Sequence, residues 1–539
     1  MSLPEKNEYD YIVVGAGSAG CAVAARLAES GEHSVLLVEA GPRDTSPWIH
    51  IPLGYGKLFN NPRFNWMLES EPEPFLNGRR TFQPRGKVLG GTGSINGMLY
   101  IRGQREDYDA WSQSGAEGWS YADVLPWFKK SEDQSRGADA YHGTGGPIRV
   151  SDQPQRHELA DAFIEAAAQR GHPRREDFNG EQQEGAGYFQ LTTRNGMRCS
   201  SAAGFLRGKL GHSRLEVAVG VKVTRLLLEG QSAVGVCLRN HARTSNVMAR
   251  RETIVCAGTF HSPQLLQASG IGPASLLEKH GIGVVLDLPG VGQNLHDHFR
   301  TNSVYVCNQP ITHNDTMRGP LRKAKAAIQY ALTRRGPLAT GLYAGGFFRS
   351  STDLERPDLQ ITMWTSSLKR RDARCVELHD FSGFTMNAIV LRPKSRGSVS
   401  IASADIDAPP IIQFNYAHHE DDVRLATQGV KLLRSLSTAP ALAQLIEREH
   451  TPGPSVQTDA QIEAYVRANS GSTFHAVGTC RMGTDRNAVV DGRLRVRGIA
   501  RLRVVDASVF PTIPSGNTHA PTMMVAERAS QMILKETHS

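Results

Sequence analysis

Three glycines near the N-terminus have a spacing that suits the binding of phosphate groups. Gly15, Gly17 and Gly20 form the pattern Gly-x-Gly-x-x-Gly in VVGAGSAG. The apolar residues 9–14 predict a buried strand before them, and the helix formers of residues 19–30 predict a helix after them. The first glycine permits a tight turn, the second lets backbone approach a pyrophosphate, and the third lets the helix pack closely on the strand. Unpaired N–H groups at the start of the helix would then face the phosphates.

An acidic residue follows the next predicted strand, residues 34–38. Glu39 lies 39 − 20 = 19 residues after the last glycine, where a carboxylate can accept hydrogen bonds from a ribose diol. Ser18 and Ala19 in the glycine turn, and Ala40 beside the acid, are expected at the same nucleotide. Strand, helix and acid in this order predict a dinucleotide site, and this unit alone leaves NAD and FAD open.

Further segments carry a family resemblance. They are residues 85–103 (RGKVLGGTGSINGMLYIRG), 258–272 (GTFHSPQLLQASGIG), 475–483 (HAVGTCRMG) and 504–529 (VVDASVFPTIPSGNTHAPTMMVAERA). With the glycine triplet, they resemble the glucose-methanol-choline (GMC) oxidoreductase family, in the family's order and over essentially the whole chain. The chain looks most like the bacterial dehydrogenases of this family that act on aliphatic primary alcohols, choline or sugars. The resemblance implies FAD as the cofactor and the oxidation of an alcohol by hydride transfer to the flavin.

The resemblance also implies which residues hold the flavin. The loop GKVLGGTGSIN contains four glycines, which suits close approach of the backbone to a flat ring or a pyrophosphate. Some family members attach the flavin covalently through a histidine just before the asparagine of this loop; Ile95 stands there, so a noncovalent FAD is expected. The implied cofactor positions beyond the first nucleotide unit are Gly91, Thr92, Asn96, Gly97, Met98, Leu99, Val223, Asp506, Ala507, Asn517, His519, Pro521 and Thr522. For Asp506 the alternative is an ordinary turn aspartate, and for Val223 an ordinary core valine.

Two histidines are the candidate catalytic residues. Alcohol oxidation removes a hydroxyl proton and a hydride from the adjoining carbon, and a neutral imidazole has the right basicity near pH 7 to take the proton. The resemblance implies His475 as the general base and His519 as its partner, at a site that the family fills with Asn or His. Similar bacterial sequences usually have GNTN where this chain has GNTH. The His/His pair is commoner in relatives acting on sugars and aryl alcohols, so the substrate and the choice of base stay open, as does a purely structural role for both.

The last helix is expected to support this site. Pro521 suits a first helical turn because it has no N–H and a fixed φ, so a helix over residues 520–535 is predicted to begin beside His519. Its positive end could stabilise negative charge on a reduced flavin.

Other constellations carry less chemistry. His296 and His298 are two residues apart and could chelate a metal with His261 or Cys480, but no complete ligand set at a recognised spacing is present, so no metal is expected. In the family this segment supports the flavin site. Ser262 lacks the Gly-x-Ser-x-Gly turn of a hydrolase.

Size and patterning indicate how these residues are positioned. A chain of 539 residues exceeds one ordinary core, so two lobes are expected. The predicted fold is α/β, a Rossmann-like FAD-binding domain of GMC type with a discontinuous substrate-binding domain built on an antiparallel sheet. The FAD-binding domain is assigned to residues 8–154, 214–300 and 470–539, and the substrate-binding domain to residues 155–213 and 301–469. The active site is expected between them.

Local patterns add further elements. An irregular excursion is expected over residues 48–85, because the stretch is rich in Pro, Asn and Gly. Strands are predicted around residues 214–228, 233–239, 252–256 and 502–505, and helices over residues 262–268 and 423–437.

Composition excludes several classes. The formal charge of +8, from 61 basic and 53 acidic residues, is small for this length, and no basic block suggests nucleic-acid binding. Weak contact with an anionic membrane surface is compatible with the charge. The seven cysteines fit a reducing compartment without disulfides. The polar N-terminus and the lack of a long apolar window predict a soluble cytoplasmic protein, with peripheral contact at the inner face of the membrane left open.

The sequence leaves the acceptor and the substrate open. The electron acceptor is a quinone, a dye-like acceptor or oxygen, and the oligomeric state is not determined by the sequence. A choline dehydrogenase would need an aromatic cage and a carboxylate around the ammonium group, for which Trp66, Tyr55 and Phe474 are candidates. An oxygen-using aryl-alcohol or sugar oxidase, an NAD-dependent enzyme and a non-catalytic flavin-binding protein are also compatible with parts of the pattern.

Overall fold

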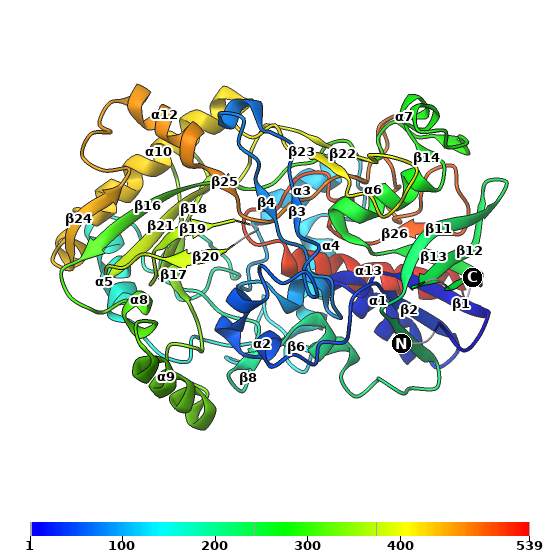
Figure 1. Cartoon of the computed structure of the whole chain (residues 1–539), viewed down its shortest axis with the longest axis horizontal. Coiled ribbons are helices and arrows are strands. Elements are labelled where there is room, and N and C mark those ends of the chain that lie inside the picture. The colour runs from blue at the N-terminus through cyan, green and yellow to red at the C-terminus, as the bar shows by residue number, and fades with distance from the viewer. Residues whose placement is uncertain (1–2, 242, 373–374, 538–539) are drawn as a thin grey trace.

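The N-terminal glycine pattern lies in a βαβ unit at the centre of a mixed sheet (Figure 1). A computed structural model describes residues 3–241, 243–372 and 375–537. Strand β1 (Glu8–Val14), helix α1 (Ser18–Glu29) and strand β2 (Val35–Glu39) follow the predicted ranges to within one residue at each end. The second half of β1 and most of β2 are buried apolar runs, which suits parallel strands covered on both faces.

The first sheet gathers strands from distant parts of the chain. Its order is β10-β2-β1-β13-β12-β11, and β26 pairs with β13. β1, β2, β10, β13 and β26 pair in parallel, whereas β11, β12 and β13 form an antiparallel meander. The remaining strands of this sheet are β10 (Leu215–Val219), β11 (Lys222–Glu229), β12 (Ser232–Asn240), β13 (Arg243–Val255) and β26 (Leu502–Val504).

The C-terminal helix covers this sheet beside α1. Helix α13 (His519–Thr537) packs against α1 and against α4 (Tyr121–Ser131), so the two ends of the chain share one core (Figure 1). Glu527 of α13 has a fully buried side chain, and its Oε1 lies 2.6 Å from Nη2 of Arg26 on α1. This ion pair satisfies the buried carboxylate, which would otherwise be costly.

The second sheet is antiparallel throughout. Its order is β24-β16-β21-β18-β17-β7, and β25 pairs with β16. Helices α5 (Glu158–Gln169) and α10 (Glu420–Ser437) pack on it. Its strands are β7 (Gly185–Tyr188), β16 (Phe299–Cys307), β17 (Leu342–Phe348), β18 (Leu359–Trp364), β21 (Gly383–Val390), β24 (Ile446–Thr451) and β25 (Gly471–Ser472). The predicted fold class, a Rossmann-like domain with an antiparallel-sheet domain, is confirmed.

Three predicted ranges differ from the observed elements for local reasons. Helix α10 begins at Glu420, before the predicted residue 423, because the His419 side chain accepts a hydrogen bond from the Asp421 amide and caps it. Strand β13 is longer than predicted. The sequence pattern missed its first half because those residues are polar and partly exposed. The predicted domain boundary at residue 300 falls inside β16, which belongs to the second sheet; the boundaries themselves stay a prediction.

Short elements complete the structure. Helix α9 (Pro320–Thr333) projects from the lower left of the molecule in Figure 1, and α6 (Gly258–Ala268) lies near the glycine turn. The 3-10 helices are η1 (Pro52–Lys57), η2 (Pro74–Leu76), η3 (Gly91–Ser94) and η5 (Ala507–Val509), and η4 (Ala202–Leu206) is a π-helix. The others are α2 (Pro47–His50), β3 (Leu68–Glu69), β4 (Phe82–Gln83), α3 (Arg105–Gln113), β5 (Glu132–Gln134), β6 (Ile148–Val150), β8 (Thr193–Arg194), β9 (Met197–Arg198), β14 (Ile271–Gly272), α7 (Ala274–Lys279), β15 (Leu286–Asp287), α8 (His313–Thr316), β19 (Leu368–Arg371), β20 (Val376–Leu378), β22 (Ser398–Ser400), β23 (Ile411–Gln413), α11 (Pro440–Ala443) and α12 (Asp459–Asn469).

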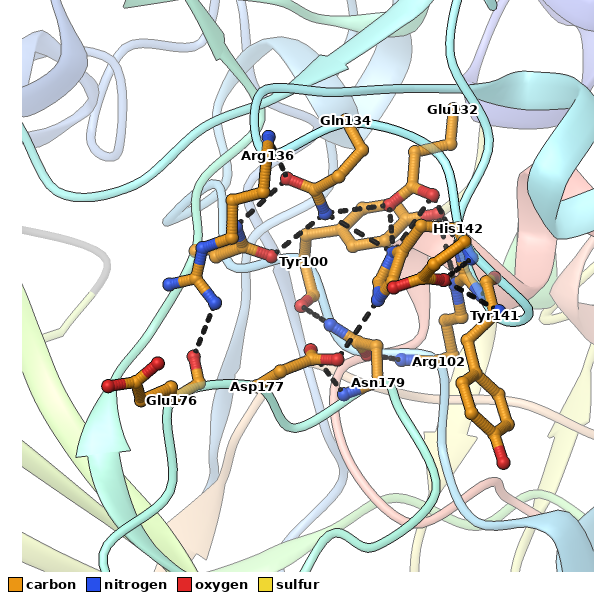
Figure 2. Close-up of polar contacts among 12 residues, drawn as sticks. Tyr100, Arg102, Glu132, Gln134, Arg136, Tyr141, His142, Glu176, Asp177 and Asn179 are labelled. Atoms are coloured by element: carbon orange, nitrogen blue, oxygen red, sulfur yellow. Dashed lines mark hydrogen bonds and ion pairs between the residues drawn. The ribbon is translucent and has the colours of Figure 1, made fainter.

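A buried polar network connects the segment after the glycine-rich loop of residues 86–96, which we call the flavin loop, to the segment that precedes β7 (Figure 2). Nη2 of Arg102 lies 2.7 Å from Oε2 of Glu132, and both side chains are almost fully buried. His142 bridges two carboxylates, with Nδ1 3.1 Å from Glu132 and Nε2 3.0 Å from Asp177. Burial alone would lower the pKa of His142, but its hydrogen bonds to Asp177 and Glu132 outweigh burial and raise the pKa to about 9.

This network predicts a pH dependence of stability. Because the pKa of His142 is raised on folding, its contribution is fully present below the unfolded-state pKa of about 6.5 and is lost as pH rises through about 9. Near pH 6.5, a His142→Gln variant should melt at a lower temperature than the wild type. Its free energy of unfolding should be lower by about 1–3 kcal/mol. Thermal unfolding from pH 6 to 10 checks this: the difference between the two proteins should shrink as pH rises, and a constant difference would contradict it.

Candidate active site

A cavity of about 340 Å³ lies between the two sheets and is lined by both. On the side of the first sheet, the wall is formed by the glycine turn, the flavin loop and the start of α13. The second sheet contributes one face of its central strands. The residues from this face are Arg300 of β16, Leu342 of β17, Gln360, Thr362 and Trp364 of β18, and Asn387 and Ile389 of β21.

The cavity brings together nearly all the predicted site residues. Those that line it are Gly15, Gly17, Ser18, Ala19, Glu39, Ala40, Gly91, Thr92, Asn96, Gly97, Met98, Leu99, Val223, His475, Asp506, Ala507, Asn517, His519 and Thr522. Gly20 and Pro521 do not line it. A Cβ on Gly20 would lie 1.8 Å from the carbonyl oxygen of Gly15, so this glycine packs α1 against β1. Pro521 is buried in the first turn of α13.

The glycine turn leaves an open cradle at the start of α1. A Cβ built on Gly17 would meet no heavy atom within 4 Å, whereas one on Gly91, at φ +54°, would lie 2.6 Å from Cα of Gly17. The two loops therefore touch backbone to backbone, and Gly17 faces open space on its other side. Helix α1 has no side-chain cap and no acidic residue in its first turn, so its N–H groups are available. These features fit a pyrophosphate.

His519 has a buried polar atom without a hydrogen-bond partner among the described residues, which also fits a cavity that holds a cofactor. Its Nδ1 lies 2.9 Å from Oγ of Ser18 in the glycine turn, while its Nε2 is buried without a hydrogen-bond partner in the described part of the chain. Burial, with the charge of Arg198, lowers the pKa of His519 to about 4, so the imidazole is neutral. Buried polar atoms are nearly always hydrogen-bonded in complete proteins, and this one lines the cavity, where a bound polar group would satisfy it.

The two predicted acidic positions are held by hydrogen bonds from the protein itself. Glu39 accepts hydrogen bonds from the amides of Ala16 and Gly41, at 3.0 and 2.8 Å, and burial raises its pKa to about 7. Asp506 accepts from the Gly258 amide at 2.8 Å and from the Ser262 hydroxyl at 2.6 Å. Both carboxylates shape the cavity wall; direct contact of either with a cofactor stays a prediction.

His475 also lines the cavity, in a ring of hydrogen bonds. Its Nδ1 lies 2.9 Å from Nδ1 of His298, and its Nε2 lies 3.0 Å from the amide nitrogen of Asn517. Its backbone N–H donates to Oδ1 of Asp297 at 2.7 Å. The preceding residue, Phe474, has φ +70°, a conformation that is costly for a non-glycine residue and that recurs at functional sites.

These contacts determine where the proton of His475 lies. Nε2 of His298 is 3.0 Å from the carbonyl oxygen of Leu391, and a carbonyl can only accept, so this nitrogen carries a hydrogen. Burial lowers the pKa of His298 to about 3, so the ring is neutral and its Nδ1 is an acceptor. Nδ1 of His475 must then donate to it. Burial first, and then the nearby His298, lower the pKa of His475 well below its usual range, so its Nε2 carries a lone pair, which accepts from Asn517.

Sequence reasoning misses part of this arrangement. It suggests His298 only as a metal ligand or as support for the flavin, and Asn517 only as a cofactor contact. The histidine that lies near the cradle, His519, makes no hydrogen bond to His475 among those of the described residues. Its predicted role as partner in a His/His pair therefore stays a prediction. Only the sequence NLHDHF, with a histidine beside an aspartate, could have signalled the contact of His298.

Comparison with known proteins decides the family. Two family profiles described as GMC oxidoreductase match residues 9–300 and 393–526. The chain belongs to the GMC oxidoreductase family. As a GMC oxidoreductase it is an FAD-dependent enzyme that acts on CH–OH groups, so the predicted family, cofactor and enzyme class are confirmed.

Relatives of this GMC oxidoreductase include oxidases and dehydrogenases. It is 41% identical to an oxygen-dependent choline dehydrogenase of Photobacterium profundum, over 98% of this chain and 93% of that protein. A pyridoxine 4-oxidase from Mesorbium loti is 29% identical, with a TM-score of 0.88 over 98% of this chain and 99% of that one. A formate oxidase variant from Aspergillus oryzae is 26% identical, with a TM-score of 0.92 over 99% of this chain and 100% of that one.

The open cradle predicts a selective loss of cofactor. In a Gly17→Val variant the added Cβ has no heavy atom within 4 Å, so the protein should fold, but the side chain would occupy the space expected for the pyrophosphate. The flavin-to-protein ratio should fall at least about tenfold, the effect of about 1.4 kcal/mol in binding. Absorbance of the purified protein measures this ratio.

A matched control is Gly283→Val, at an exposed position that also has open space around its Cβ. It should keep the wild-type flavin content. A Gly17→Val protein that is folded and fully loaded with flavin would show that the cradle is not the phosphate site.

Proposed function

We propose that this enzyme oxidises a primary alcohol to the aldehyde with noncovalent FAD, and that His475 is the general base. The observation that carries the proposal is the lone pair on Nε2 of His475, at the cavity wall and held in place by the hydrogen bond from Nδ1 to His298. FAD, when bound in the cavity, supplies the hydride acceptor. Ile95 occupies the position of the linking histidine of some relatives and has no group that could bond to the flavin.

The hydrogen bonds of His475 support a sequence of proton steps. A substrate hydroxyl that displaces the Asn517 side-chain amide from Nε2 of His475, where the two nitrogens are 3.0 Å apart, can donate to the imidazole and accept from the displaced amide. His475 takes the hydroxyl proton as the hydride leaves the carbon. Because burial disfavours the imidazolium, the proton is released again once the aldehyde departs. The lowered pKa keeps the base neutral at the expense of basicity.

His519 remains the second imidazole of the proposed site. His519 lines the cavity at the N-terminus of α13, and its buried Nε2 has no hydrogen-bond partner in the described part of the chain, which makes it a candidate to hydrogen-bond the alcohol oxygen or the cofactor. The N-terminal end of α13 adds positive potential at the same place. We propose a quinone-like acceptor or oxygen for the second half-reaction; the relatives named oxygen-dependent dehydrogenase and oxidase favour oxygen.

The assignment of the base predicts a large kinetic effect. His475→Ala should lower the rate constant of anaerobic flavin reduction by about 10²- to 10⁴-fold, the usual contribution of a general base. Stopped-flow absorbance with a panel of primary, aryl and sugar alcohols measures it. Because the pKa of His475 is lowered, the wild-type rate should decline only well below pH 6.5. Reduction of His475→Ala at the wild-type rate would exclude His475 as the base.

His298 provides a test of the proton arrangement. A His298→Ala variant removes the acceptor for Nδ1–H and should lower the reduction rate about 10- to 100-fold, as loss of an orienting partner does elsewhere. His298→Asn offers a carbonyl acceptor and should recover part of the rate. Equal rates for the two variants would indicate that His298 only fills space.

We also propose peripheral contact of α9 with an anionic membrane surface. Leu321, Ile328 and Leu332 form one exposed stripe on this helix, with 85%, 59% and 80% of each residue exposed. Ala326 and Tyr330 on its opposite side are buried. The flanking residues 316–335 include six basic side chains and no acidic one: Arg318, Arg322, Lys323, Lys325, Arg334 and Arg335. None of the helices in the described part of the chain could span a membrane.

Vesicle binding tests the contact of α9. The flavoprotein should sediment with phosphatidylglycerol vesicles at low salt and remain in solution with phosphatidylcholine, because each basic side chain near an anionic surface contributes about 1 kcal/mol. Replacing Leu321, Ile328 and Leu332 by Ser should reduce binding about tenfold or more without changing flavin content. Equal binding of the triple variant and the wild type would place the contact elsewhere.

A further inference from the structure

The end of the cavity beside His475 carries two arginines around one aromatic ring. The guanidinium carbons of Arg300 and Arg371 lie 5.8 and 5.0 Å from the centroid of the Phe474 ring. Arg371 also lies 4.3 Å from the centroid of Phe59. Phe474 directly precedes His475 in the chain. The charge of Arg300 acts on His475, and both arginines line the same cavity as the base.

Neither guanidinium has an ion-pair or hydrogen-bond partner within the described residues. The two most completely buried arginines of the fold are paired, Arg102 with Glu132 and Arg503 with Glu252. The other cations of the cavity wall are also engaged. Arg85 donates to the carbonyl oxygen of Phe474, and Lys222 lies 2.6 Å from Asp407.

No carboxylate faces these two arginines from the described part of the cavity wall. Its two acidic residues, Glu39 and Asp506, accept hydrogen bonds around the glycine turn and at the start of α6. Asp297, whose charge acts on Arg300, is not in the wall and accepts from the backbone of His475 and the hydroxyl of Tyr416. The charge of Asp297 partly offsets that of Arg300, but no acid of the described cavity wall pairs with either arginine, and this end of the cavity is therefore positive.

The charges persist at neutral pH. Burial and the neighbouring Arg371 lower the pKa of Arg300 to about 9, which still leaves it protonated at pH 7. Two like charges that are partly removed from water and unpaired are costly. A bound anion would relieve both the desolvation and the mutual repulsion, and a carboxylate matches the guanidinium in geometry.

We propose that the substrate is an alcohol that also carries a carboxylate, which Arg300 and Arg371 bind while the hydroxyl lies at His475. This rests on the proposed function and names its substrate class. The hydroxyl proton goes to His475 and the hydride to FAD, the alcohol becomes an aldehyde, and the carboxylate is unchanged. Phe59, Phe474 and Trp364 provide apolar walls for the carbon skeleton between the two ends.

The same geometry disfavours choline, despite the similarity to choline dehydrogenases. A quaternary ammonium group is stabilised by aromatic faces together with a carboxylate. Here the faces of Phe59 and Phe474 are already covered by guanidinium groups. Trp66 lies against His261, with ring centroids 4.4 Å apart, and beneath Lys222. A cation at this end would meet two positive charges.

The experiment compares matched alcohols that differ in charge. The holoenzyme is mixed anaerobically with 4-(hydroxymethyl)benzoate, with neutral 4-methylbenzyl alcohol and with cationic 4-(trimethylammonio)benzyl alcohol, and flavin bleaching is followed. An aliphatic set uses 4-hydroxybutyrate, 3,3-dimethylbutan-1-ol and choline. The ratio of the reduction rate constant to the dissociation constant should favour the anion about 10- to 100-fold over the neutral analogue, as expected for hydrogen bonds to charged groups.

The possible failures are distinguishable. If no alcohol in either set reduces the flavin, the proposed function fails and this inference with it. If a neutral or cationic alcohol reduces the flavin as well as the anion or better, the alcohol chemistry stands and the carboxylate proposal is overturned.

Variants separate binding from folding. Arg300→Gln and Arg371→Gln should each weaken the anionic alcohol about 10-fold or more relative to the neutral analogue. Arg370→Gln is the matched control, because Arg370 is on the same strand but exposed and paired with Asp372; it should change neither. Calorimetry with unreactive 4-methylbenzoate gives a second measure of anion binding. Equal losses for the anionic and neutral alcohols would reduce both arginines to a structural role.

Discussion

The pairing of β16 with the short strand β25 is the constraint on which the active site depends. Its register sets Phe299 opposite Ser472 and Arg300 opposite Gly471. Just beyond the paired residues, the Thr473 amide donates to the carbonyl oxygen of His298, which brings His298 and His475 into hydrogen-bond contact. Because alternate residues of a strand share a face, His298 and Arg300 belong to one face. The pairing thus holds His298, the hydrogen-bond partner of His475, in place and fixes Arg300, the first of the two arginines proposed to bind an anion, two residues along the chain. A slip of one residue would remove both.

Local chemistry explains what the sequence could predict. Three features are each encoded within a few tens of residues and appear close to the expected positions. They are the glycine turn, the acid at the end of β2 and the helix after the C-terminal loop. The hydrogen bonds of His475 are different, because His298 is 177 residues away in the chain. Its tautomer further depends on the Leu391 carbonyl. No spacing rule contains that information, which arises from strand register and the packing of two sheets.

The unpaired arginines are a second feature that composition could not reveal. A net charge of +8 spread over 539 residues says nothing about two guanidinium groups that share one end of a cavity. Elsewhere the fold pairs buried charges, including Arg26 with Glu527 and Arg102 with Glu132. A protein that leaves two charges unpaired in a cavity gives up some stability there, and such local violations are expected where a ligand completes the interaction.

Similarity over the whole chain and specificity at one end of the cavity are therefore separate matters. The fold, the glycine cradle and the buried imidazole define what the enzyme can do to a C–OH group, and these require most of the chain to be in place. In our proposal, selection of the alcohol rests on Arg300 of β16 and Arg371 of β19, whose replacement leaves the two cores untouched. A single charge change at such a position alters binding by more than a factor of ten, while it barely alters overall identity. An enzyme 41% identical to choline dehydrogenases can thus keep their alcohol chemistry and bind a substrate of the opposite charge, because fold similarity does not fix the site.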